Sequence, residues 1–203
     1  MSVKQIVLIV DDNKINRLML KKILENDYEV VQAENGKQAM DLFKKGLNAS
    51  AVILDLNMPV MNGFDFLENF YIDINHSNIP VIITTVCNDQ QSELRALKLG
   101  AWDYITKPYN IDILKFRLTN AILRCKLNNF NRIKYLAEFD TLTGIYNKNK
   151  FFDATKDMLK RYAEKQFIFI RLDIDRFKLI NSFFGASEGD SILKYIADGI
   201  NSR

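Results

Sequence analysis

Three carboxylates directly follow two apolar runs of this 203-residue sequence. Asp11 and Asp12 come after IVLIV, and Asp55 comes after AVIL. A carboxylate beside a buried strand costs free energy unless a cation pairs with it, and like charges at about 4 Å repel by roughly 1 to 4 kcal/mol. Carboxylate oxygens hold Mg²⁺ beside a phosphate, and a further carboxylate can act as a nucleophile. The spacing therefore predicts a cation site suited to phosphoryl transfer.

Two other kinds of side chain complete this interpretation. Asp55 is the natural nucleophile, because it follows a different run from the adjacent pair. Lys107 could neutralise the charge that develops on the phosphoryl group, and the hydroxyl of Thr84 or Thr85 could donate to it. Each element alone also has an ordinary explanation, since acids cap helices and a Lys-Pro pair occurs in plain loops.

The elements that must position these residues alternate along the first 109 residues. The apolar runs QIVLIV, EVVQA, AVILDL, PVIITTV and WDYIT are typical of strands, and helical periodicity lies between them. Continuous apolar strands indicate a parallel sheet covered on both faces. The alternation predicts a doubly wound α/β domain, whose site lies outside the carboxyl ends of the strands. The acids, the threonines and Lys107 all fall there.

A long helix is expected from about Asn110 to Phe139, because neither Pro nor Gly occurs between Pro108 and Gly144. Its first half is expected to pack on the domain, and beyond about Lys126 it is interpreted as a stalk that pairs with a partner. The predicted apolar stripe comprises Ile111, Leu114, Leu118, Ile122, Cys125, Ile133 and Leu136, with Asn129 in a polar slot.

A second unit begins after the turn DTLTG. The segment NKNKFFDATKDMLKRYAEK predicts a helix, QFIFIRLDID predicts a buried strand, and another helix follows GASEGD. One strand with two helices does not complete a sheet. We therefore expect a partial α/β unit.

Composition narrows the class of partners. The net charge is +3 with interleaved acids and bases, so a nucleic acid is not an expected partner. Apolar runs fall short of the roughly 20 residues that a membrane span needs, and MSVKQ is not typical of a signal peptide. The sequence favours a cytoplasmic protein in which Cys87 and Cys125 are free thiols.

Taken together, the motifs closely resemble the receiver domain of two-component response regulators. They are the DD pair at 11 and 12, DLNMPVMNG from Asp55, PVIITT ending at Thr85, and GAWDYITKP ending at Pro108. The resemblance spans residues 4 to about 125. It implies a flavodoxin-like five-stranded sheet and a phosphoryl group accepted by Asp55 from a histidine kinase or phosphotransfer protein.

The same resemblance implies roles for individual residues. Asp11, Asp12, Asp55 and the backbone carbonyl of Asn57 would coordinate Mg²⁺ or Mn²⁺. Lys107 and Thr85 would contact the phosphate, and Tyr104 stands at the position of the switch aromatic. The family usually has a small residue after the threonine, and we expect Val86 to crowd the approach to the phosphate there.

The second unit resembles the opening half of a GGDEF domain, the fold of diguanylate cyclases. The motifs are DTLTGIYNKNKFF and RLDIDRFKLINSFFGASEGDSIL, within residues 140–203. By family position, Asp173 and the carbonyl of Ile174 would hold metal, Lys178 would approach phosphate, and Asn181 and Asp190 would read guanine. GTP with Mg²⁺ is implied only for a complete output domain. The GGDEF hairpin is absent from these 203 residues, so no cyclase activity is expected of them.

The sequence thus predicts a receiver over residues 1–125, a stalk helix over 110–139 and a truncated GGDEF-like domain over 140–203. We interpret it as a response regulator that passes a signal through the stalk, as a homodimer, to an output concerned with cyclic di-GMP. The parent would then be a diguanylate cyclase or a GGDEF-EAL phosphodiesterase. The alternatives are a docking or dimerisation receiver that is never phosphorylated, with a degenerate GGDEF domain as a GTP-binding or regulatory module, and a DNA-binding regulator.

Overall fold

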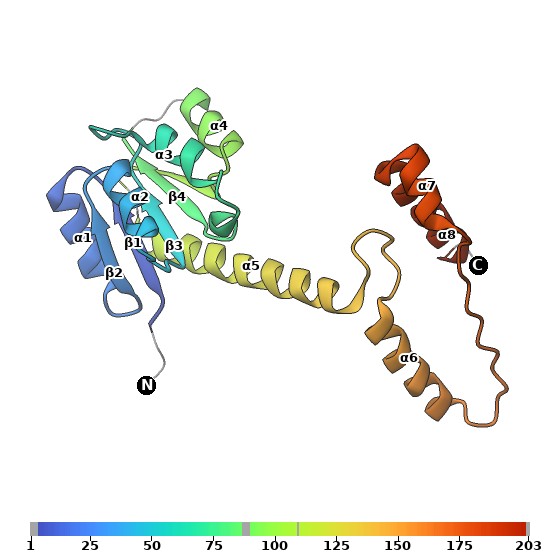
Figure 1. The fold of residues 1–203 in the computed structure, drawn as a ribbon. Coiled ribbons are helices and arrows are strands. Elements are labelled where there is room, and N and C mark those ends of the chain that lie inside the picture. The colour runs from blue at the N-terminus through green and yellow to red at the C-terminus, as the bar shows by residue number, and fades with distance from the viewer. Residues whose placement is uncertain (1–3, 87–89, 109, 202–203) are drawn as a thin grey trace. The chain divides into compact units, whose positions relative to one another are not determined.

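Five parallel strands form the sheet of the N-terminal unit, in the order β2-β1-β3-β4-β5 (Figure 1). The computed structural model describes residues 4–86, 90–108 and 110–201. The strands are β1 (Ile6–Val10), β2 (Glu29–Ala33), β3 (Ala51–Leu54), β4 (Val81–Thr85) and β5 (Asp103–Thr106). This order confirms the predicted flavodoxin-like, doubly wound sheet.

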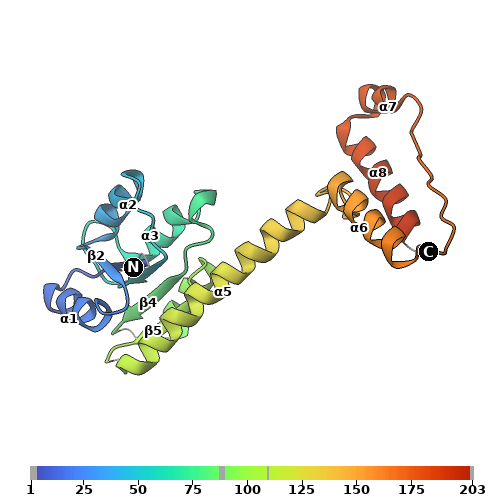
Figure 2. The same ribbon diagram turned by 90° about the horizontal axis from the view of Figure 1, so that it is seen from below.

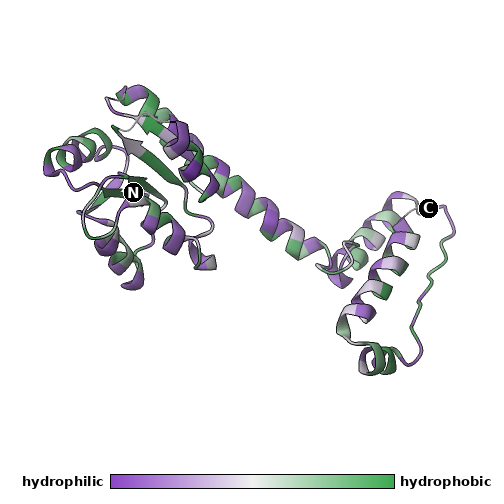
Figure 3. Ribbon diagram, turned by 90° about the horizontal axis from the view of Figure 1, so that it is seen from above, coloured by the Kyte–Doolittle hydropathy of each residue, from purple (hydrophilic) through white to green (hydrophobic). Residues whose placement is uncertain are grey.

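Helices cover both faces of this sheet. On one face the core contains side chains of α2 (Gly36–Lys44), α3 (Gly63–Phe70) and α4 (Gln90–Lys98). On the other it contains side chains of α1 (Lys14–Leu24) and of the first half of α5 (Ile111–Glu138), which runs alongside the sheet in Figure 2. A short 3₁₀ helix, η1, spans Ile74–His76. Successive strand residues point to opposite faces, and β1 and β3, which are covered on both, are apolar throughout. Much of the sheet is accordingly green in Figure 3.

Asparagines begin the helices that follow the first three strands. The side chains of Asn13, Asn35 and Asn62 accept hydrogen bonds from backbone N–H groups in the first turns of α1, α2 and α3. An N-cap of this kind contributes about 1 kcal/mol. Each cap therefore fixes where a helix begins just beyond a strand end, which is where the acids lie.

The long helix α5 has the predicted extent, and its first half packs on the sheet as expected. Leu114, Leu118, Ile122 and Cys125 of the predicted stripe are buried, together with Ala121. Ile111, Ile133 and Leu136 of that stripe are exposed instead. The Cys125 thiol donates to the carbonyl of Asn78 and is free, whereas Cys87 lies outside the described residues.

The chain divides into two units, Met1–Asn129 and Phe130–Arg203. In the second, a turn follows the end of α5, where the Oδ1 of Asp140 accepts hydrogen bonds from the backbone N–H groups of Leu142 and Thr143. The helices of this unit are α6 (Lys148–Arg161), α7 (Phe177–Phe184) and α8 (Ala186–Asn201), and α7 packs against α8.

The predicted strand QFIFIRLDID is wrong as a structural assignment. Its residues form neither strand nor helix, and Ile168 and Ile170 are exposed. A strand is stable only when a neighbour pairs with its backbone groups. Among the described residues of this unit, the only strand-type pairing is a single bridge between Phe139 and Tyr146. The described part of the unit is therefore helical.

None of the described helices is long and apolar enough to cross a membrane.

Candidate functional site

The acids of the first and third strands lie side by side at the carboxyl edge of the sheet. Val10 pairs with Leu54 at the ends of β1 and β3, and the Asp55 N–H donates to the Val10 carbonyl over 2.8 Å. Asp11 and Asp55 follow directly. Carboxylate oxygens of Asp11, Asp12 and Asp55 all lie within 4.8 Å of one another, and among the described residues no other group of acids, histidines or cysteines gathers in this way.

Lys107 brings a buried positive charge to this cluster from the end of β5. Its Nζ lies 2.7 Å from Oδ2 of Asp11 and 3.2 Å from Oδ2 of Asp55. The side chains of Lys107, Asp11 and Asp55 are 12%, 1% and 10% exposed. Removing one partner from such a pair leaves the other charge buried without compensation, which is strongly destabilising. The Lys107 ammonium thus compensates part of the negative charge of the three carboxylates.

The three carboxylates have different hydrogen-bonding environments. Asp11 accepts from the Asn13 N–H over 2.9 Å and from the Asn16 amide over 3.2 Å to each oxygen, besides Lys107. Asp12 is exposed. Oδ1 of Asp55 is buried and has no hydrogen-bond partner among the described residues. A buried acceptor without a donor costs free energy, so this oxygen is suited to a cation or an incoming electrophile.

The pKa of Asp55 is raised above its ordinary value. Burial is the largest cause, since it disfavours the charged form, and the neighbouring Asp11 carboxylate adds to the effect while Lys107 opposes it. A carboxylate with a raised pKa is more basic, and therefore a better nucleophile, than an exposed one. The site thus makes Asp55 the chemically distinct member of the cluster.

Without divalent metal, we expect Asp55→Asn to have a higher free energy of unfolding than the wild type at about pH 7. A carboxyl whose pKa is higher in the folded than in the unfolded chain is protonated preferentially when folded. Its contribution to the free energy of unfolding therefore falls as the pH rises from the ordinary pKa through the raised one. Asparagine remains neutral at both pH values. The difference in free energy of unfolding between Asp55→Asn and the wild type should therefore become smaller towards about pH 4.

Urea unfolding at both pH values measures this difference. Asp41→Asn is the control, because Asp41 makes only an exposed ion pair with Lys37. Equal stability of Asp55→Asn and the wild type at both pH values would contradict the expectation.

The remaining candidate residues lie on β4 and β5 and in the loop after β3. Thr85 is fully buried at the end of β4, and its carbonyl accepts from the Lys107 N–H over 2.7 Å. Tyr104 on β5 is buried in the core that faces α2, α3 and α4. The Asn57 side chain is exposed, two residues beyond Asp55.

An open, largely apolar pocket of about 510 Å³ adjoins the acids. Val86 is 71% exposed and forms part of its wall. The lining comprises Asn13, Asn16, Met19, Val86, Lys107, Pro108 and Ile111. Val86 and Lys107 therefore line the same pocket, and the expected crowding of the phosphate by this valine stays a prediction.

The sequence interpretation missed two polar residues of α1. Asn16 contacts the Asp11 carboxylate, and the buried Arg17 donates to the carbonyls of Asp11 and Asp12. Arg17 lies on the same buried face of α1 as Leu20 and Leu24. The sequence did contain one indication of this contact, because Arg17 occupies a core-facing position of the helical pattern six residues after Asp11.

A close approach of two backbones shapes the loop that follows Asp55. An added Cβ at Gly63 would lie 2.6 Å from the Asp55 carbonyl oxygen, and the Gly63 N–H donates to Leu56. Within this loop Val60 has φ 70° and is 83% exposed. A β-branched residue is rare in this left-handed region because its Cβ approaches the carbonyl.

We expect Val60→Gly to raise the free energy of unfolding by roughly 1 kcal/mol. Glycine has no Cβ and so relieves the strain, although it adds entropy to the unfolded chain. Chemical denaturation measures the difference. Val60→Ala, which retains a Cβ, should gain less, and a glycine variant no more stable than the alanine variant would contradict this account.

The candidate residues of the second unit do not form a metal cluster in the described part of the chain. Asp173 and Lys178 are exposed, and Ile174 is half-buried. Asn181 of α7 packs against Gly189 of α8, where an added Cβ would lie 1.9 Å from its Oδ1. Asp190 is the next residue and is exposed. The structure therefore places Asn181 near Asp190, whereas Asp173 lies in the segment between α6 and α7.

Two protein families match separate parts of this chain. Residues 7–119 match the response regulator receiver domain, and residues 137–203 match the diguanylate cyclase GGDEF domain. The chain belongs to the response regulator receiver family, with a receiver domain followed by a partial GGDEF domain.

Curated relatives are identical to this chain at about one aligned residue in three. Histidine kinase P4 of Formosa agariphila is 35% identical over 135 residues, which cover 64% of this chain and 10% of that protein. The "Probable transcriptional regulator ycf27" of Guillardia theta is 31% identical over 185 residues, covering 91% and 68%. A chemotaxis protein CheY homolog of Campylobacter jejuni is 31% identical over 118 residues, covering 57% and 91%.

Solved structures resemble the same part. A receiver domain protein from Clostridium thermocellum has a TM-score of 0.56 at 32% identity and covers 61% of this chain and 98% of its own. Chemotaxis protein CheY4 of Vibrio cholerae has a TM-score of 0.55 at 28% identity, covering 59% and 99%.

Proposed function

We propose that the chain is a response regulator that accepts a phosphoryl group on Asp55 from a histidine kinase or a phosphotransfer protein. An Asp55 carboxylate oxygen attacks phosphorus of the phosphohistidine, a P–O bond forms, and the P–N bond breaks with its electron pair remaining on the imidazole. The observation that carries this proposal is the buried Oδ1 of Asp55, which lies beside Asp11 and Lys107 and has no hydrogen-bond partner among the described residues. Lys107 can stabilise the charge of the transferring group.

The donor set fits a hard divalent cation. Asp11, Asp12, Asp55 and the backbone carbonyl of Asn57 would hold Mg²⁺ or Mn²⁺, because carboxylate and carbonyl oxygens are the ligands these ions prefer. When bound, the ion neutralises charge on the phosphoryl oxygens. In this proposal the acids bind the ion, Asp55 attacks the phosphorus atom, and Lys107 and Thr85 contact the phosphate.

Incubation with a small phosphodonor such as acetyl phosphate tests the proposal. The intact mass of the purified chain should increase by one phosphoryl group in the presence of Mg²⁺. A metal chelator should abolish the increase. A chain that gains no phosphoryl group from the small donor or from a panel of histidine kinases would overturn the proposal.

An apolar surface on α1 supports a protein as the phosphodonor. Ile15, Leu18 and Met19 are exposed next to the acidic site, and Met19 also lines the pocket with Val86 and Ile111. A phosphohistidine carried on a partner's helix could dock here with its imidazole directed to Asp55. The exposed apolar side chains would then be covered in the transient complex.

Phosphorylation would act through Thr85 and Tyr104. An aspartyl phosphate adds charge and acceptor oxygens, and contacts made only in that state favour one of two conformations. A change in population from 1:99 to 99:1 needs about 5.5 kcal/mol of such preference. We propose that Tyr104 is the side chain whose position reports this change.

The proposed output is concerned with cyclic di-GMP, in the cytoplasm. The match to the GGDEF domain supports this, with Asp173 and the Ile174 carbonyl for metal, Lys178 for phosphate, and Asn181 and Asp190 for guanine. One relative's name suggests transcriptional regulation, but the C-terminal match to the GGDEF domain favours the cyclic di-GMP output. The other alternative is a docking receiver that is never phosphorylated, and the costly acidic cluster with Lys107 speaks against it.

We further propose that the protein forms a homodimer through α5. A row of side chains on the outward face of this helix repeats at spacings of three and four residues, which is typical of a two-stranded coiled coil. The row comprises Ile113, Phe116, Asn120, Leu123, Leu127 and Phe130, of which the apolar members are all exposed. Asn120 thus replaces Asn129 as the polar position that would specify how two helices align.

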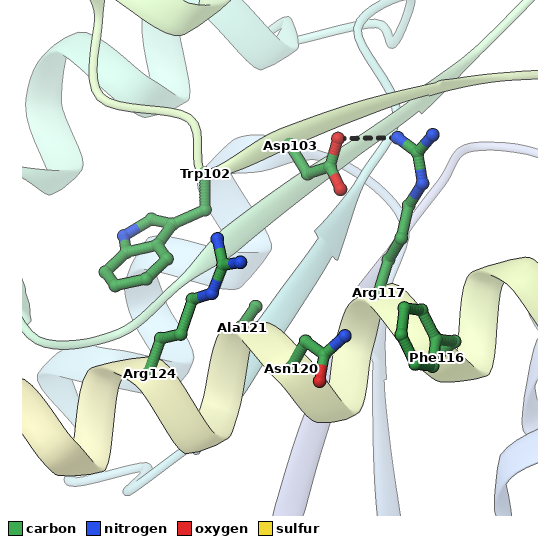
Figure 4. Close-up of a pocket in the computed structure, with 7 residues that line it drawn as sticks. All are labelled: Trp102, Asp103, Phe116, Arg117, Asn120, Ala121 and Arg124. Atoms are coloured by element: carbon green, nitrogen blue, oxygen red, sulfur yellow. Dashed lines mark hydrogen bonds and ion pairs between the residues drawn. The ribbon is translucent and has the colours of Figure 1, made fainter.

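The surroundings of this row favour a parallel pair of identical copies. Asp112 and Arg117 flank it at positions that meet in a parallel coiled coil, so opposite charges of two copies would lie close together, with Arg117 also paired to Asp103 of its own chain. Figure 4 shows Arg117 bound to Asp103, with Phe116, Asn120 and Arg124 projecting from the same helix and Arg124 beside Trp102. These residues line a hollow of about 200 Å³ that a second copy of α5 would cover.

Leu127→Asp is expected to weaken this dimer at least tenfold, because it places a charge within the apolar row. Light scattering with and without beryllofluoride, a phosphoryl mimic, measures the fraction of dimer. Ile72→Asp is the matched control, since Ile72 is exposed but lies outside α5. A wild-type monomer under both conditions at high concentration would rule the dimer out.

A further inference from the structure

Arg17 links the two adjacent acids to the second strand. Its side chain is 7% exposed. Nη1 donates to the carbonyl oxygens of Asp11 and Asp12 over 2.8 and 2.9 Å, and Nη2 donates to Oε1 of Glu34 over 2.7 Å. One guanidinium therefore binds both peptide groups that follow the acids, and it does so from the second turn of α1.

The segment that carries the acids is restrained on both sides. The Asp11 N–H donates to the Ala33 carbonyl over 3.3 Å, and the Arg17 N–H donates to the Asn13 carbonyl over 3.1 Å. The carbonyls of Asp11 and Asp12 are the remaining backbone acceptors of the turn, and Arg17 binds both. Fixing these two peptide planes fixes the directions in which the Cα–Cβ bonds of the acids point.

The charge of Arg17 is compensated away from the acidic cluster. Glu34 follows β2 and pairs with Nη2, so the guanidinium does not need a carboxylate of the cluster. Arginine remains protonated in proteins and presents its donors in a rigid fork. Only a fork can reach two adjacent carbonyls and a carboxylate at once, whereas the single ammonium of a lysine could satisfy fewer of these acceptors.

Resting on the proposed function, we propose that Arg17 is a positioning residue for the cation site. By holding the peptide groups of Asp11 and Asp12, it keeps both carboxylates directed at the position where Mg²⁺ or Mn²⁺ binds beside Asp55. Groups that orient metal ligands without touching the ion change affinity about 10- to 100-fold when they are removed. A purely structural role would change stability and leave the cation affinity of the folded protein unaltered.

A direct Mn²⁺ titration followed by electron paramagnetic resonance tests this role, because it reports bound ion without any reaction. Arg17→Met retains the apolar stem and removes the donors, and we expect it to raise the Mn²⁺ dissociation constant about tenfold. Arg17→Lys should give an intermediate value. Arg95→Met is the matched control, since Arg95 pairs with Glu68 on the surface over 3.3 Å, and it should bind Mn²⁺ as the wild type does.

The kinetics give a second readout. In Arg17→Met, the Mg²⁺ concentration needed for half-maximal phosphorylation should rise about tenfold, with most of the maximal rate recovered at saturating metal. A folded Arg17→Met protein with a wild-type Mn²⁺ dissociation constant would overturn the inference.

If Arg17→Met does not fold, Arg17→Lys decides between weaker binding, which supports the role, and unchanged binding, which overturns it. A wild-type chain that neither binds Mn²⁺ nor takes up phosphate would instead overturn the proposed function, and this inference with it.

Discussion

Replacing Asp55 with asparagine is expected to abolish phosphorylation from a small phosphodonor. The asparagine amide cannot supply the attacking carboxylate oxygen, and no nearby side chain is equivalent. Asp11 is held by Asn13, Asn16 and Lys107, and Asp12 is exposed. Of these three acids, only Asp55 has a buried oxygen without a hydrogen bond in the described structure. Burial also raises the pKa of Asp55, which makes its carboxylate a better nucleophile than an exposed one.

Intact mass with peptide mapping measures the effect. The wild type should carry one phosphoryl group on the peptide that contains Asp55, and Asp55→Asn should carry none. Asp41→Asn, which removes a surface acid outside the site, should be labelled as the wild type is. Undiminished labelling of Asp55→Asn would show that another residue is the acceptor.

Lys107→Met is expected to destabilise the metal-free protein by about 3 kcal/mol near neutral pH. The ammonium contacts two buried carboxylates, so its loss leaves like charges close together without their cation. Mg²⁺ should recover much of the loss, because an ion that binds only the folded chain stabilises it by mass action. The stabilisation by Mg²⁺ should therefore be larger in the variant than in the wild type.

Denaturant unfolding with Mg²⁺ and with a chelator measures both effects. Lys115→Met is the control, because Lys115 makes an exposed pair with Asp27 over 3.0 Å. Exposed pairs contribute up to about 1 kcal/mol, and no dependence on Mg²⁺ is expected for this variant. A Lys107→Met protein as stable as the wild type without metal would show that Lys107 does not compensate the acids.

The sheet and the acidic edge could be predicted because both follow from short-range patterns. Continuous apolar strands imply a parallel sheet, and parallel strands bring Asp11 and Asp55 to one edge although they lie far apart in the sequence. The same topology places Lys107 at this edge, although β5 and β1 are not neighbouring strands.

Other features depend on contacts that no local pattern specifies. Arg17 was missed because the path of a long side chain back to the backbone depends on packing of α1 on the sheet. The segment QFIFIRLDID has the composition of a strand, but strand formation requires a neighbour, and the described residues of its unit supply none. On α5, apolar residues occupy both the inward and the outward rows, so only packing distinguishes Leu118 from Leu123.

The lysine among the acids also decides which cations can satisfy the cluster. Asp11, Asp12 and Asp55 carry three negative charges when ionised, and the ammonium of Lys107 leaves two of them uncompensated. A divalent ion restores electroneutrality, whereas Na⁺ or K⁺ leaves an excess charge in a poorly solvated place, and a trivalent ion overshoots. We therefore expect Lys107, which binds no ion itself, to favour divalent over monovalent cations at this edge of the sheet through its charge.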